Sequence, residues 1–313
     1  MKKRVPIEKS LKDKTIPKKI KGKLKLAQKA KIFSEQELKL DSTNNYSSFA
    51  QLDEKYVSYI ISVAPLYELK HHKWKFPFIG SVPYKGFHTH KEAEEEALKY
   101  PKSDFDTYIR GATAYSTLGW FDDPILSSML RYKDYNLVNV IIHETVHATI
   151  YIKDHADFNE RLATFIGNKG TELFYKKHFK NSKDILLQIQ NENHDDKIFS
   201  DFVSATVKQL NIWYTDKENH DLQKKDAYFQ ALLKKFKSEI LPKMKSKQYR
   251  HFHKNKFNNA KLLSLKTYFY DLSDFEKAFK KFNSDFEKFI SFCKKLEDQK
   301  DPEAYLKKFV LVN

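Results

Sequence analysis

The chain has 313 residues, 41% of them hydrophobic and 15% aromatic, so it can bury the core of one large domain or two small ones, and a globular protein is expected in place of a disordered chain. Its single cysteine, Cys293, excludes an intramolecular disulfide and a zinc site built of several thiolates. The formal net charge is +16, of which +11 lies in residues 1–31 and +5 in all the rest. The charge distribution therefore predicts a basic N-terminal arm at residues 1–40 and a compact domain at residues 41–313.

The basic arm is rich in lysine and could contact an anionic membrane or nucleic acid. Lysine dominates over arginine and no aromatic residue alternates with it, which favours a solvated surface. A weak contact of residues 1–31 with an anionic membrane stays open as a partner. No secretory hydrophobic region follows Met1, and no apolar run approaches the roughly 18 residues of a membrane span. As written, the sequence predicts a cytoplasmic protein.

The first third after the arm is rich in strand signals. Residues 56–64 (YVSYIISVA) are β-branched and aromatic and predict a strand, and residues 75–87, broken by Pro and Gly, predict interrupted extended structure. A short helix is expected at residues 90–100 and another strand at residues 106–116. These segments together predict a small sheet.

Helical patterns dominate the remainder. Asp123 and Pro124 suit the N-cap and first position of a helix that continues through ILSSMLRY. Further helices are expected from Leu137 onwards, with amphipathic stretches at residues 184–192, 199–214, 222–241 and 273–296. The predicted fold class is α+β, mainly α, with a small sheet bordering a cleft and a helical body.

A His-Glu-x-x-His run, His143-Glu144-Thr145-Val146-His147, lies inside an apolar helical segment. On a helix the two histidines stand at i and i+4 on one face, so both can bind one metal ion while Glu144 lies beside the metal-activated water. This is the ligand geometry of a zinc hydrolase with one Zn²⁺, and Glu144 is the expected general base.

The third metal ligand is expected on a helix that returns towards these histidines. Residues 153–157 form a loop between two antiparallel helices, and a rise of about 1.5 Å per residue brings Glu160 back to the level of His143 and His147. Asp154, His155 and Asp157 compete for the role, but capping or loop positions suit them better. We therefore predict Glu160 as the third ligand.

At these residues the chain resembles the predicted bacterial aminopeptidase family of the gluzincin type. Its members share a His-Glu-x-x-His helix followed by an Asn-Glu-x-x-Ala helix, here HETVH at 143–147 and NERLA at 159–163. The resemblance extends over nearly the whole chain, through FPFIGSVPYKGF at 76–87, AYSTLGWFDDPILSS at 114–128 and NNAKLLSLKTY at 258–268. It implies a zinc metallopeptidase, an aminopeptidase by family name, that acts on peptide substrates.

The resemblance also implies residue roles beyond the metal ligands. Residues Ala114, Tyr115, Ser116, Thr117 and Leu118 resemble the strand that pairs with the substrate backbone in gluzincins. Tyr268 is the candidate donor to the oxyanion, although a core tyrosine is an alternative. In addition, the sequence near Met1 resembles an internal stretch of relatives, so a natural protein that begins upstream would be periplasmic or membrane-anchored.

Two positions depart from the gluzincin pattern. Thr164 stands where many gluzincins place an acidic residue that orients a metal histidine. AYSTLG contains no carboxylate to bind the α-ammonium group of a substrate, so exopeptidase activity rests on the family name.

Other patterns carry less. His88 and His90 lack a carboxylate-rich partner and suit a surface loop, and the absence of a Gly-rich phosphate loop argues against a nucleotide. The alternative function is a helical, membrane- or nucleic-acid-associating protein that uses the basic arm and has a structural or inactive zinc site.

Overall fold

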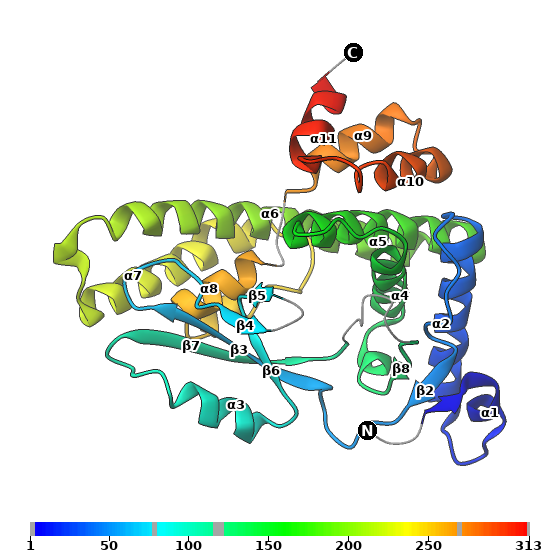
Figure 1. Cartoon of the computed structure of the whole chain (residues 1–313), viewed down its shortest axis with the longest axis horizontal. Coiled ribbons are helices and arrows are strands. Elements are labelled where there is room, and N and C mark those ends of the chain that lie inside the picture. The colour runs from blue at the N-terminus through cyan, green and yellow to red at the C-terminus, as the bar shows by residue number, and fades with distance from the viewer. Residues whose placement is uncertain (1–3, 77–79, 115–121, 268–270, 312–313) are drawn as a thin grey trace. The chain divides into compact units, whose positions relative to one another are not determined.

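The chain is described at residues 4–76, 80–114, 122–267 and 271–311 in a computed structural model (Figure 1). It divides into two compact units. Unit 1 comprises residues 1–57, 113–189 and 271–313, and unit 2 comprises residues 58–112 and 190–270. Each unit therefore combines segments that are distant in sequence.

Unit 1 contains one three-stranded sheet in the order β1 (Val5–Pro6), β2 (Ser48–Ala50) and β8 (Ile125–Leu126). β1 runs antiparallel to β2, and β2 runs parallel to β8. Its helices are α1 (Ile7–Lys12), α2 (Lys18–Gln36), α4 (Asp134–Thr149), α5 (Ala156–His178), the start of α6 (Lys183–Trp213), α9 (Ser273–Lys281), α10 (Phe286–Lys294) and α11 (Pro302–Leu311), with a one-turn helix at Met129–Arg131.

The core of unit 1 forms where α2, α4 and α5 pack against one another. On α4, buried side chains recur three or four residues apart, because only that spacing keeps one face of a helix turned inward. The α4 residues Val138, Ile141, Ile142 and Val146 and the α5 residues Leu162, Phe165 and Ile166 are all at most 2% exposed. This packing fixes the two helices that carry the predicted metal ligands.

The basic segment predicted as a separate arm at residues 1–40 is integrated into unit 1. Leu24, Ala27, Ala30 and Phe33, each three residues apart, form the buried side of α2. The Phe33 ring lies edge-on to Phe174 of α5, with 5.3 Å between centroids. The lysines between these positions conceal the apolar spacing, which explains why charge alone suggested an arm.

The helix predicted to begin at Asp123 is also wrong. Ile125 and Leu126 form β8, opposite Phe49 and Ala50 of β2, and only one helical turn follows at Met129–Arg131. The N–H of Asp123 donates to Asn45 Oδ1 at 2.8 Å. Proline is compatible with extended backbone as well as with a helix start, so partners elsewhere in the chain decided the outcome.

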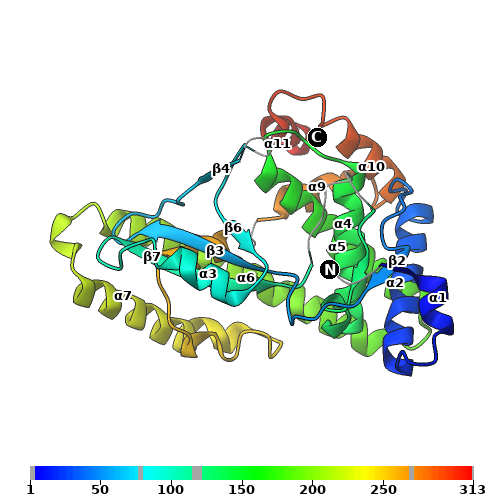
Figure 2. The ribbon, with the colours of Figure 1, turned by 60° about the horizontal axis from the view of Figure 1, so that its bottom comes forward.

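Unit 2 contains a three-stranded antiparallel sheet in the order β6 (Lys85–Phe87), β3 (Ser58–Pro65), β7 (Phe105–Ala112), and a hairpin of β4 (Trp74–Phe76) and β5 (Gly80–Val82). The strands predicted at residues 56–64 and 106–116 correspond to β3 and β7 (Figure 2). Its helices are α3 (His90–Ala97), the rest of α6, α7 (Leu222–Lys235) and α8 (Asn259–Lys266), with single turns at Lys217–Asn219, Phe236–Ile240, Leu241–Lys243 and Phe252–Lys254.

Helix boundaries differ from the amphipathic stretches in three places. The stretches at 184–192 and 199–214 belong to one helix, α6, and the stretch at 222–241 ends as α7 at Lys235. The stretch at 273–296 breaks into α9 and α10, because Asn283 and Ser284 between them have φ of 55° and 60°. The mainly helical architecture with small sheets is compatible with the α+β class. No described helix is both long and apolar enough to cross a membrane.

Candidate metal centre

Helix α4 places His143 and His147 one turn apart on the same face. Ile142 and Val146, which neighbour the two histidines in sequence, are buried. The hydroxyl groups of Thr145 and Thr149 donate to the carbonyls of Ile141 and Thr145, at 2.7 and 2.8 Å. These bonds satisfy two hydroxyls without leaving the helix. The face that carries the histidines therefore has a rigid support.

Glu160 is positioned by the residue before it. The Asn159 side chain accepts from the N–H of Ile152 at 2.9 Å and donates to the carbonyl of Ile152 at 2.8 Å. This pair of hydrogen bonds closes the loop between α4 and α5, in which Asp154 adopts a left-handed conformation with φ of 64°. The Asn-Glu pair therefore combines a loop clamp with a side chain directed at the histidines.

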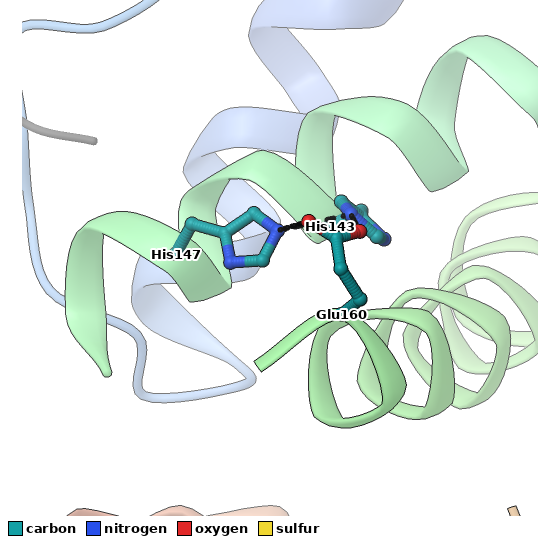
Figure 3. Close-up of side chains that lie close together, drawn as sticks. All are labelled: His143, His147 and Glu160. Atoms are coloured by element: carbon teal, nitrogen blue, oxygen red, sulfur yellow. Dashed lines mark hydrogen bonds and ion pairs between the residues drawn. The ribbon is translucent and has the colours of Figure 1, made fainter. Parts of the chain in front are cut away.

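The three predicted ligands come together. His143 Nε2 lies 3.5 Å from one Glu160 oxygen, His147 Nε2 lies 3.4 Å from the other, and the two Nε2 atoms are 3.1 Å apart. All the ligand atoms lie within 4.8 Å of one another, and Figure 3 shows the three side chains directed towards one another from α4 and α5. The geometry can accommodate a single metal ion.

The charges in this cluster favour a cation. Burial raises the pKa of Glu160, but hydrogen bonds with His143 and His147 outweigh burial and hold that pKa well below its usual range. Burial lowers the pKa of His143, while Glu160 and the charge of Glu144 outweigh it and raise that pKa. Two carboxylates thus draw positive charge to one place, and a divalent cation would satisfy the same demand.

Glu144 lies beside the ligands with unused bonding capacity. Its Oε2 atom is buried and has no hydrogen-bond partner among the described residues. A buried acceptor without a donor is costly and is typical of a site that receives a ligand or water. His147 Nδ1 likewise has no partner in the described part of the chain, so no described residue takes the place of the acid that many gluzincins have where this chain has Thr164.

Tyr46 is a neighbour of the site that the sequence did not single out. Burial, followed by the charges of Glu144 and Asp123, raises the pKa of its phenol far above the usual value. Its φ of 62° is unusual for tyrosine, and its N–H donates to the Asp123 carbonyl at 2.6 Å. Nothing in the polar DSTNNY stretch signals this approach, because partners far along the chain create it.

The approach of α4 and α5 depends on small residues. A Cβ on Gly170 would lie 2.7 Å from a Leu38 methyl and 3.2 Å from Ile142 Cδ1, and a Cβ on Gly167 would lie 3.3 Å from Asn139 Oδ1. Glycine at these two positions allows a separation that a larger residue would increase. The distance between the histidines and Glu160 depends on that separation.

The remaining predicted residues have different outcomes. Of the ligand competitors, Asp154 and Asp157 are exposed loop or first-turn residues, and His155 precedes α5. Ala114 is partly buried against the core of unit 1. The other predicted functional residues, Tyr115, Ser116, Thr117, Leu118 and Tyr268, lie outside the described residues.

A protein-family model described as "Putative aminopeptidase" matches residues 1–307. The chain belongs to this family. The match includes the His-Glu-x-x-His helix, the helix of Glu160 and the basic N-terminal segment, so it spans nearly the whole chain. No significant match was found among curated proteins or among solved structures.

Proposed function

We propose that the protein is a zinc-dependent peptidase, and more specifically an aminopeptidase, in which His143, His147 and Glu160 hold one Zn²⁺. The observation that carries the proposal is the convergence of these three ligand atoms beside the unpaired Glu144 oxygen. Two imidazoles and one carboxylate, with a position left for water, are the ligand set of a catalytic zinc site. The family match supports peptide substrates.

Glu144 has the central chemical role in this proposal. A zinc ion at the site would supply Lewis-acid chemistry and make water acidic near neutral pH. Glu144 then takes the proton from that water and delivers it to the amine that leaves when the peptide bond breaks. The buried Oε2 atom of Glu144, which accepts no hydrogen bond from any described residue, is the acceptor for that proton.

The family resemblance supplies two further parts. Residues 114–118 are proposed to pair with the substrate backbone, and Tyr268 is proposed to donate to the oxyanion. Removing one oxyanion donor typically lowers kcat about 10²- to 10³-fold. A Tyr268→Phe variant that keeps full kcat would remove this tyrosine from the proposal and leave the metal ligands untouched.

The decisive experiment is digestion of a mixed peptide library with and without a chelator, with products identified by mass spectrometry. We expect cleavage that stops on chelation and returns with Zn²⁺, and the loss of single N-terminal residues. Internal cuts would refute the aminopeptidase assignment while keeping the peptidase. No metal-dependent cleavage in any peptide would refute both.

The general base has its own test. Glu144→Gln keeps the size of the side chain but removes its basicity, so we expect kcat to fall about 10²- to 10⁴-fold. Zinc content and thermal stability should not change, and the exposed-loop variant Asp154→Asn is the matched control. If Glu144→Gln hydrolyses peptides at the wild-type rate, the proposed mechanism is wrong.

The alternative of a binding protein built around the basic segment has no supporting observation. Deletion of residues 1–31 would not test it cleanly, because Ile7, Leu24 and Ala30 belong to the core of unit 1. Substitution of exposed lysines of α2 separates a loss of binding from a loss of folding.

A further inference from the structure

A second basic segment lies in unit 2, at residues 234–256. It contains eight lysines and one arginine against a single acid, Glu239, for a net charge of +8. Together with the +11 of residues 1–31 it exceeds the total of +16, so the rest of the chain carries −3. Outside residues 1–31, the positive charge is therefore concentrated in residues 234–256. The net +5 of residues 32–313 does not reveal this, because the other residues of that region are net acidic.

Every cation of this segment faces solvent. The exposed side chains are Lys234, Lys235, Lys237, Lys243, Lys245, Lys247, Arg250, Lys254 and Lys256. None of them forms an ion pair with a carboxylate in the described part of the chain. Nine mutually repelling charges without a carboxylate partner among the described residues are unfavourable in the isolated protein and favourable against a polyanion.

Two nearby carboxylates, Asp195 and Asp196, accept hydrogen bonds from groups of this segment other than its cations. Asp195 of α6, which is fully buried, accepts from the N–H groups of Lys245 and Ser246 at 2.8 and 2.6 Å. Asp196 accepts from Gln248 Nε2 at 2.8 Å and from Tyr249 Oη. These bonds fix the segment from below and leave the lysine side chains free.

Aromatic side chains of the same segment point inward. Tyr249 stacks on Phe199 with 4.2 Å between ring centroids, and Phe236 and Phe252 lie 4.7 Å apart in the same core. In sequence, Phe236 lies between Lys235 and Lys237, and Tyr249 precedes Arg250. The rings are packed in the core while these neighbouring cations are exposed. The yellow to orange ribbon after α7 in Figure 2 follows this path. The result is an ordered segment whose cations are exposed.

The charges of two of these cations, Lys237 and Lys254, act on the pKa of His253. Burial, followed by the charges of Lys237, Lys254 and His251, lowers the pKa of His253. Side chains from the turn at Phe236–Ile240 and from residues 251–254 therefore act on one place.

We propose that the surface formed by residues 234–256 binds the headgroups of an anionic phospholipid bilayer. The surface contains one arginine, and none of the large exposed hydrophobic side chains of the described chain belongs to it. Bases have no aromatic platform on which to stack, and there is little guanidinium for bidentate phosphate contacts, which argues against nucleic acid. Clustered lysines that act as point charges suit a surface of lipid headgroups.

The test is co-sedimentation of the full chain with vesicles of phosphatidylcholine alone or with 30% phosphatidylglycerol, at low and high salt. The variant Lys243→Gln, Lys245→Gln, Lys247→Gln, Lys254→Gln is compared with a control of equal charge on the same unit. That control carries Lys70→Gln, Lys102→Gln, Lys208→Gln and Lys217→Gln, all at exposed positions. Circular dichroism melting checks that both variants fold.

Each lysine near an anionic bilayer contributes about a fivefold increase in binding, so the four substitutions together should weaken binding by about 600-fold. The control should bind within about twofold to threefold of wild type, since its lysines lie outside the surface. Binding should vanish on neutral vesicles and at high salt. These three results together support the proposal.

Three outcomes overturn it: no binding of the wild-type chain to the anionic vesicles, an equal loss in the control, or a surface that prefers another polyanion to the vesicles. For the last, a 30-base-pair DNA duplex and polyglutamate are added as competitors at equal charge. If either removes the wild-type chain and the surface variant loses binding to that competitor instead, the surface serves nucleic acid or acidic protein.

Discussion

The two units each bury a cluster of ionisable and polar groups, and the two clusters differ in how completely they are bonded. In unit 2, Asp106 accepts from Lys225 Nζ at 2.6 Å and from the N–H of Asn259 at 2.8 Å. Asn259 in turn accepts from Tyr214 Oη at 2.9 Å and donates to the carbonyl of Leu66 at 2.9 Å. This network is closed, because each group meets a partner within the unit.

In unit 1 the cluster is open. His143, His147 and Glu160 direct their ligand atoms at one another, while Glu144 Oε2 and His147 Nδ1 have no partner among the described residues. Both clusters contain a carboxylate and a basic group, so composition does not separate a scaffold from a site. Unused bonding capacity does.

The largest effect should come from opening the closed network. Asp106→Asn leaves the buried Lys225 without its counter-charge, and loss of one member of a buried pair costs about 3–5 kcal/mol of unfolding free energy. Burial lowers the pKa of Lys225 and Asp106 opposes that, so the lysine depends on this partner. Urea denaturation measures the loss, and zinc affinity should not change.

Asp104→Asn, two residues away and exposed, is the matched control and should leave stability within about 0.5 kcal/mol. A tolerant Asp106→Asn variant would mean that the network of unit 2 is not a scaffold.

The opposite response is expected in the open cluster. Glu160→Gln removes a charged ligand, and zinc affinity should fall more than about 100-fold, since even partners of ligands contribute 10- to 100-fold. Stability of the metal-free protein should fall less than in Asp106→Asn, because Glu160 bonds the two histidines but supports no backbone group. Competition with a chromogenic chelator gives the affinity, and Asp157→Asn, the rejected ligand, is the control. Equal losses in both variants would contradict the assignment of Glu160.

The convergence of His143, His147 and Glu160 was predictable because its signal is local. His143 and His147 are four residues apart on one helix, and the return of Glu160 needs only helix rise and a short loop. The N-terminal helices and β8 were mispredicted because their partners are distant: Ile125 pairs with Phe49, and Phe33 packs on Phe174. Likewise, the approach of Tyr46 to Glu144 and the missing partner of His147 Nδ1 have no local signature.

In unit 2, the unfolding free energy should also depend on pH through the buried carboxyl group of Asp196. Burial raises the pKa of Asp196 to about 6, with the charges of Glu192 and Asp195 adding to it. The folded protein then binds this proton more tightly than the unfolded chain, whose value is near 3.8. Stability from this group is full below pH 3.8 and is lost as pH rises through 6.

In the wild-type protein, this group should lower the unfolding free energy by at most about 3 kcal/mol between pH 4 and 6. Asp196→Asn should remove that decrease. Tyr249 and Gln248 can still donate to the amide oxygen, so the network should survive. Urea denaturation across this pH range checks the slope, and an unchanged slope would contradict a raised pKa for Asp196.

The units also differ in how they present positive charge, and the smallest effect is expected from α2. Lys23 and Lys31 of α2 pair with Asp134 and Glu35. Among the other lysines of α2, Lys18, Lys25 and Lys29 are exposed along one stripe with Ile32. At 1.5 Å per residue the outer two lysines are about 16 Å apart, beyond the Debye length of roughly 8–10 Å, so they act almost singly.

These lysines lie outside residues 234–256, so the variant Lys18→Gln, Lys25→Gln, Lys29→Gln should weaken binding to anionic vesicles by no more than about tenfold, less than the unit 2 variant. Lys300→Gln, Lys307→Gln, Lys308→Gln, also exposed in unit 1, is the control of equal charge. The side chains substituted in the α2 variant face solvent, so the melting temperature of that variant should equal that of the wild-type protein. A loss greater than that of the unit 2 variant would transfer the main contact with the bilayer from residues 234–256 to α2.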